Sequence, residues 1–205
     1  SLFAKDSTTA KYYFSVGGAV WNHFSINQVI TNNGGDPFHL FTPEMGFGFR
    51  VQNRKIQGDL GMKLIFSKKS DGHIPYKFHY GVVQLALRYN VLKIGNRALF
   101  AGINFGYIPF NFTLYPHNSV IDLDKINPQT QTGTINMKSY SLLLGPSVLF
   151  DKVVDIPGLT VSLALSYQFS IVNRQWEAAN ATLLHPPIED GNKLTVSFLI
   201  FPFQN

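Results

Sequence analysis

Six residues in the first half of the chain have side chains that could form ion pairs, transfer protons or guide ions: Glu44, Arg50, Gln57, Asp59, Lys63 and Arg88. Each lies in a segment where polar and apolar residues alternate, so each projects from the polar face of an extended strand. A turn centred on positions 53 and 54 would place Glu44 opposite Lys63 and Arg50 diagonally close to Asp59, with Arg88 on the following strand within reach. These spacings predict a compact charged cluster.

Such a cluster could have one of three roles. It could plug a narrow interior with mutually compensated charges, line a gated path for a small solute, or form a ligand-binding or catalytic site. We favour the plug, because a charge removed from water is tolerated when it is paired and hydrogen bonded.

The elements that position these residues are strands, because period-two alternation recurs along the whole chain and helical periodicity is hard to find. Pro146 falls inside one strand, where it removes a ladder hydrogen bond and predicts a bulge or a local break. The eight predicted strands cover Tyr12–Phe24, Thr42–Gln52, Ile56–Phe66, Phe78–Val91, Ala98–Phe112, Ser139–Phe150, Leu159–Ile171 and Lys193–Phe203.

Short and long connections alternate strictly. The short ones are QNRK, LKIGNR and DKVVDIPG, and the long polar ones span about 25–41, 67–77, 113–138 and 173–192. This order predicts that all short turns lie at one end and all long loops at the other. Residues 1–205 would then form a single domain, an eight-stranded antiparallel β-barrel with residues 1–10 as an N-terminal segment.

The two faces of the strands differ in a way that indicates a membrane. Ile56, Leu60 and Met62 lie on a continuous bulky apolar face, whereas Asp59 and Lys63 lie on a face of small and polar residues. Only 14% of the residues are charged, which is about half of the usual share. The apolar face is therefore expected to meet lipid and the polar face to line the interior, as in an all-β transmembrane barrel.

At this point the chain resembles the small eight-stranded bacterial outer-membrane barrels of the OmpA, OmpX and OmpW type, including those of Bacteroidota. The resemblance covers about Lys11 to Phe203 and implies periplasmic termini, extracellular long loops and a mature chain left after signal-peptide removal. Rings near the strand ends resemble the aromatic girdles of such barrels: Tyr12, Tyr13, Phe41, Tyr76, Phe78, Tyr80, Phe110, Phe112, Tyr140, Phe201 and Phe203.

Several classes of function are disfavoured. The chain has no cysteine, and no two of its histidines have metal-ligand spacing with a carboxylate, so we expect no metal or other cofactor. The net charge of +5 comes from scattered residues, which argues against nucleic acid. Lipid-modifying enzymes exist among outer-membrane barrels, but His117 and Ser119, with Asp122 or Asp124, do not match their motifs, and we expect no catalysis.

The last long loop combines apolar residues with acids and prolines. Trp176, Leu183, Leu184 and Ile188 could fold over the barrel mouth as a cap or dock a partner. We therefore expect a non-enzymatic interaction or accessory subunit, or surface protein, contacting lipopolysaccharide or phospholipid and other outer-membrane or periplasmic proteins. The alternatives are a channel for small or hydrophobic solutes and a soluble lipocalin-like ligand-binding barrel.

Overall fold

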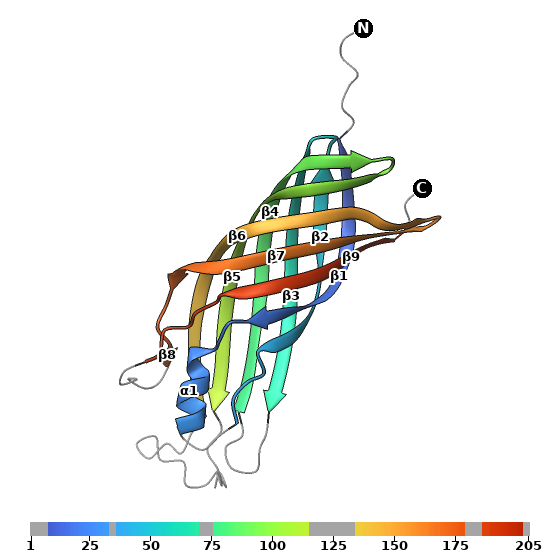
Figure 1. Ribbon diagram of the computed structural model, residues 1–205. Helices are drawn as coiled ribbons and strands as arrows, with labels where there is room; N and C mark the ends of the chain where they lie inside the picture. Colours follow the sequence, from blue (N-terminus) through green and yellow to red (C-terminus); the bar gives the residue numbers. More distant parts are fainter. Residues whose placement is uncertain (1–7, 33–35, 70–75, 115–133, 179–185, 203–205) are drawn as a thin grey trace.

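A computed structural model describes residues 8–32, 36–69, 76–114, 134–178 and 186–202 (Figure 1). Nearly all of these residues lie in long antiparallel strands, and the predicted strands are found within a few residues of their expected ends. The elements are β1 (Thr9–Trp21), α1 (Ser25–Asn32), β2 (Phe41–Gln52), β3 (Ile56–Lys69), β4 (Tyr76–Ile94), β5 (Arg97–Leu114), β6 (Ile135–Ile156), β7 (Leu159–Asn173), β8 (Glu177–Ala178) and β9 (Lys193–Pro202).

The sheet closes on itself. Its order is β5-β4-β3-β2-β1-β9-β7-β6, and β5 also pairs with β6, so that each of the eight long strands has a neighbour on both sides. The first and last strands form the seam, from Trp21↔Lys193 to Phe14↔Ile200. Closure satisfies the backbone donors and acceptors that an open edge would leave unpaired. The predicted eight-stranded antiparallel barrel is confirmed.

The faces are inverted relative to a soluble barrel. The inner face buries Glu44, Asp59 and Lys63, whereas large apolar side chains on the outer face of every long strand are exposed. Examples from six strands are Phe14, Phe47, Leu60, Leu85, Phe169 and Phe198. A wall of this kind requires a bilayer around it, so the chain is a transmembrane barrel and the soluble lipocalin-like alternative is wrong.

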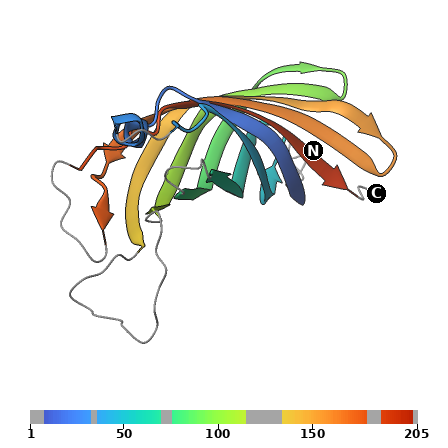
Figure 2. The same cartoon turned by 90° about the horizontal axis from the view of Figure 1, so that it is seen from below.

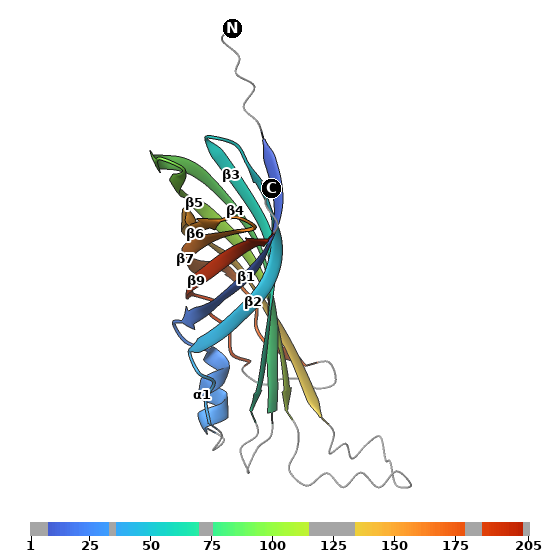
Figure 3. The ribbon, with the colours of Figure 1, turned by 90° about the vertical axis from the view of Figure 1, so that its right-hand side faces the viewer.

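The two ends of the barrel differ, as the loop lengths predict. Chain turns at 53–55, 95–96 and 157–158 lie at one end, which we call the short-turn end. The helix α1 lies at the opposite, long-loop end (Figure 3). The β4–β5 and β6–β7 strands continue well into segments predicted as connections, because Gly95 and Gly158 adopt positive φ angles of 63° and 81° and so permit two-residue turns.

The helix α1 was not predicted. Ile26 and Ile30, one helical turn apart, are buried, and the Asn27 side chain closes the following segment through its bonds with the Phe38 backbone. Seen from the long-loop side, α1 lies beside the ends of the orange and red strands (Figure 2). No helix among the described residues is both long and apolar enough to cross a bilayer.

The ladder between β6 and β7 is interrupted at Pro146, which agrees with the predicted local break, but no bulge forms there. The register between β6 and β7 is the same on both sides of Pro146, with Leu144 opposite Phe169 and Ser147 opposite Ser166. The register instead shifts between Leu142 and Leu143, and again between Phe150 and Val154, where Lys152 has a φ angle of 57°. The side chain of Pro146 lies on the lipid face, and its position opposite Ile103 on β5 is kept.

The inverted faces predict the effect of a charge on the wall. Leu60 is 55% exposed near the middle of β3, so Leu60→Arg should destabilise the barrel by roughly 2–4 kcal/mol in bilayers. Urea unfolding from lipid vesicles measures this, with Leu60→Ala as the control for lost packing. A Leu60→Arg variant as stable as Leu60→Ala would contradict a lipid-facing position.

Candidate functional site

The charged interior is organised around Asp59. Its carboxylate accepts hydrogen bonds from Arg50 Nε at 2.7 Å, from Gln57 Nε2 at 2.8 Å and from Arg88 Nη1. All four side chains are buried, and they come from β2, β3 and β4. The structure therefore brings these four side chains together, with one carboxylate shared between two guanidinium groups.

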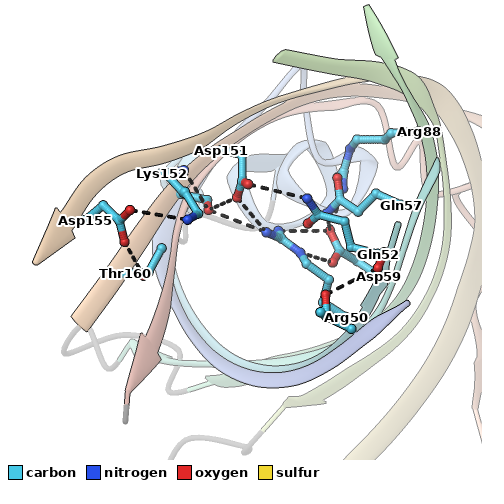
Figure 4. A network of polar contacts seen from close by, with 11 residues as sticks. Arg50, Gln52, Gln57, Asp59, Arg88, Asp151, Lys152, Asp155 and Thr160 are labelled. Carbon is cyan, nitrogen blue, oxygen red and sulfur yellow. Dashed lines mark hydrogen bonds and ion pairs between the residues drawn. The ribbon is translucent and has the colours of Figure 1, made fainter. Parts of the chain in front are cut away.

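A second carboxylate completes this cluster from across the barrel. Asp151 on β6 accepts a bond from Arg50 Nη1 at 3.2 Å and another from Ser162 Oγ at 2.8 Å (Figure 4). Arg88 Nε donates to Ser147 Oγ at 2.7 Å. The two arginines and two aspartates thus balance in charge, and they join strands on opposite sides of the ring.

Glu44 forms the centre of a separate cluster nearer the long-loop end. Its two carboxylate oxygens accept bonds from Lys63 Nζ at 2.7 Å and Lys193 Nζ at 3.0 Å. Lys63 also donates to Ser197 Oγ, and the Lys193 ammonium lies 5.0 Å from the centre of the Trp21 ring. The ring supplies a cation–π contact to the second ammonium, which has no carboxylate of its own.

The register that joins these residues differs by two positions from the prediction. Arg50 lies directly opposite Asp59, and Gly46 rather than Glu44 lies opposite Lys63. The turn is wider than expected because Asn53 Oδ1 accepts bonds from the N–H groups of residues 55 and 56. A shift of two positions keeps every side chain on its predicted face, so the cluster survives the error.

Aromatic residues share the interior with both charged clusters, and this corrects the girdle prediction. Tyr12 and Phe41 are exposed as expected, and Phe203 lies outside the described residues. The others that point inward are fully buried: Tyr13, Tyr76, Phe78, Tyr80, Phe110, Phe112 and Phe201. They share the inner face with the charged residues, because they have the same parity along their strands.

The largest buried cluster seals the long-loop end. Phe24, Ile26 and Phe38 from the first loop pack against inward rings of the barrel, with the Phe38 and Phe78 ring centres 4.5 Å apart. Trp21 Nε1 donates to Thr42 Oγ1 at 2.9 Å, so its polar edge is satisfied inside this apolar volume. The first loop is therefore part of the core.

The predicted loop contact surface is only partly retained. Trp176 is 1% exposed and belongs to the same cluster, so its side chain forms part of a cap and not of an exposed docking surface. Ile188 is 51% exposed at the rim. Leu183 and Leu184 lie outside the described residues, as do the catalytic candidates His117, Ser119, Asp122 and Asp124.

A buried acid, missed from the sequence, holds the cap together. Glu189 is fully buried and accepts bonds from Ser25 N–H at 2.9 Å, Ile26 N–H at 3.4 Å and Trp176 Nε1 at 3.2 Å. The first two donors belong to the first turn of α1, which favours a carboxylate. Glu189 therefore ties α1 to the last long loop.

Burial raises the pKa of the Glu189 carboxyl to about 7. Its hydrogen bonds lower that pKa, and the nearby charge of Asp190 raises it further. Asp190 in turn lies 3.8 Å from His23. Among the described residues, no group of three or more histidine and carboxylate side chains could hold a metal ion.

The short-turn end is open where the long-loop end is sealed. A hollow of about 220 Å³ reaches Arg50 and Asp151, and it is lined on its way in by Thr9, Lys11 and Lys152. The charged cluster is therefore the floor of a polar mouth that faces the short-turn side.

Comparison with known proteins concerns the fold. No protein-family model and no curated protein matches this sequence. Ail, the attachment invasion locus protein of Yersinia pestis, aligns with 95% of this chain and 97% of its own at 10% identity, with a TM-score of 0.47. The outer membrane protease OmpT from Escherichia coli covers 99% of both chains at 11% identity, with a TM-score of 0.44. A second Ail structure contains the heparin analogue sucrose octasulfate and scores 0.46.

The Asp59 cluster predicts a large effect from a small change. Asp59→Asn leaves two buried arginines without their shared carboxylate, so the free energy of unfolding should fall by roughly 3–5 kcal/mol. The control Glu177→Gln removes an exposed ion pair with Arg174 and should change stability by less than about 1 kcal/mol. Equal effects in urea unfolding would contradict a structural role for Asp59.

Glu189 predicts a pH dependence of stability. Its folded pKa lies above the ordinary value of 4.5, so the folded state holds the proton more tightly and loses stability as pH rises from about 4.5 through 7. The shift corresponds to roughly 3 kcal/mol at most. The unfolding temperatures of the wild type and of Glu189→Gln are measured between pH 5 and 8. Their difference at each pH separates the contribution of Glu189 from that of the histidines, which both proteins share. A pH-independent difference would show that Glu189 titrates normally.

Proposed function

We propose that this chain is a non-enzymatic integral protein of a bacterial outer membrane, acting as an interaction or accessory subunit of a complex or as a surface protein. The termini would be periplasmic, the four long loops would be extracellular, and the mature chain would follow removal of a signal peptide. The barrel would then be a rigid scaffold, and its loops and outer wall would be the surfaces that bind partners.

The filled interior is the observation that carries this proposal. From one end to the other, the described residues place the Asp59 cluster, the Glu44 cluster and the aromatic seal across the lumen. A barrel of eight strands has an interior just wide enough for its own side chains. This favours a scaffold over a channel for small or hydrophobic solutes.

The state of the interior acids also argues against catalysis by them. Asp59 and Glu44 are each held by two cationic side chains and are buried. A general acid or base must reach a substrate proton at hydrogen-bond distance. The carboxylates of Asp59 and Glu44 are instead bonded to buried cations, which is a structural role.

Partners would contact the outside of the barrel. Lipopolysaccharide and phospholipid would surround the exposed apolar wall, and other outer-membrane or periplasmic proteins would bind the loops or part of that wall. Exposed Ile188 at the rim of the cap supports a protein contact at the long-loop end. Nucleic acid is not expected as a partner.

Affinity purification of the tagged full chain from native outer membranes in mild detergent tests the proposal. A partner protein should be recovered in stoichiometric amount with the wild type. Ile188→Asn should reduce recovery severalfold if the loops bind it, whereas Ile156→Asn, at a similarly exposed isoleucine of the short-turn end, should not. Recovery of the chain alone, together with steady conductance of the pure protein in planar bilayers, would favour a channel and overturn the proposal.

A further inference from the structure

Two hairpins at the short-turn end diverge from one another. The ladder between β5 and β6 ends at Ala98↔Asp151, and beyond it the β4–β5 and β6–β7 hairpins extend separately (Figure 1). Their ends are joined again by one bond, from Asn96 Nδ2 to Asp155 Oδ2 at 3.2 Å. We call the space between the two hairpins the gap, and residues on it line two separate hollows.

The outer side of this gap is an apolar groove of about 380 Å³. Its lining includes Leu92, Ile94, Leu99 and Phe150, with Arg97 also among its lining residues. Leu92, Ile94 and Phe150 are exposed, and they continue the apolar wall onto the hairpins. A groove with this lining fits a hydrocarbon chain, and its position on the wall makes it reachable from the bilayer.

The inner side of the gap is a polar hollow of about 360 Å³. Arg54, Lys93 and Lys152 line it together with amide side chains such as that of Asn96. It shares Ala98 and Asp151 with the apolar groove, so the two volumes adjoin at the last ladder pair. An apolar slot and a polar chamber thus meet at one point of the wall.

The charge around this point is positive. Among the described residues that line the two volumes, Lys93, Arg97 and Lys152 are cations and Asp151 is the acid. Asp151 already accepts bonds from Arg50 and Ser162, and Asp155 from Asn96, Lys152 and Thr160 (Figure 4). Both carboxylates are thus bonded within the protein, Lys152 among their donors, and the positive charges of Lys93 and Arg97 favour an anionic ligand.

We propose that this gap is a binding site for one anionic phospholipid of the leaflet at the short-turn end, with an acyl chain in the groove and the acidic headgroup among the cations. A phospholipid matches the two adjoining volumes, because its acyl chain suits the apolar groove and its acidic headgroup suits the polar hollow. The site is independent of the partner-binding role proposed above, since it uses the opposite end of the barrel.

Binding of dioctanoyl phosphatidylglycerol to the detergent-solubilised full chain, measured by calorimetry, tests the site. The wild type should bind it at least about tenfold more tightly than dioctanoyl phosphatidylcholine, which corresponds to about 1.4 kcal/mol. The double variant Lys93→Glu/Arg97→Glu should lose this preference. The control Lys55→Glu reverses a charge at the same end, outside the lining of both volumes, and should keep it.

A second variant distinguishes the contribution of the groove to lipid binding from that of the cations. Leu92→Asn should weaken both lipids equally and leave the preference for the anionic one unchanged, and heat-modifiable gel mobility should show that every variant is folded. Equal binding of the two lipids by the wild type would overturn the proposal. So would glycerol phosphate binding as tightly as the lipid, or loss of the preference in Lys55→Glu.

Discussion

The structure depends on the constraint that a closed sheet in a bilayer must turn its apolar face outward. Closure through the β1–β9 seam satisfies the backbone, and the lipid solvates side chains such as Leu60 and Phe47. The interior then receives the other half of every strand, which holds the charged residues. An interior of this kind is stable when its charges are paired or otherwise compensated inside, so the ion pairs follow from the inverted faces.

Long paired side chains also need room, and small residues on the inner face provide it. At Gly48 an added Cβ would lie 2.3 Å from the Tyr13 ring, and at Gly61 it would lie 2.8 Å from the Tyr13 hydroxyl oxygen. The Tyr13 ring therefore occupies the space that two glycines leave free. The interior around the Asp59 cluster is closely packed because the large Tyr13 side chain lies against two glycines that have no side chain.

Parity along the strands was the part of the fold that the sequence predicted best, because alternation with period two survives errors in register. Glu44, Arg50, Gln57, Asp59, Lys63 and Arg88 were therefore predicted inside although their register was displaced by two positions. Lys193 could have been predicted inside, because it shares parity with Thr195 and Ser197. The buried rings of β4, such as Phe78 and Tyr80, likewise share parity with Arg88. Asp151 was missed because the predicted strand ended at Phe150, although Asp151 shares parity with the buried Ser147. Glu189 and α1 were missed because loop packing follows no period.

The two ends of the barrel acquire different properties from the same inner face. At the long-loop end, α1 and the buried Trp176 extend the apolar interior beyond the strands, and Glu189 is the acid that links them. At the short-turn end, Asp151 keeps the inward parity of Ser147 and meets Arg50, and β6 continues past it as an extended hairpin with β7. Among the described residues, the polar hollow that reaches Arg50 and Asp151 lies at the short-turn end. Charged residues near that opening can meet ligands, whereas those beyond Arg50 serve to hold the wall together.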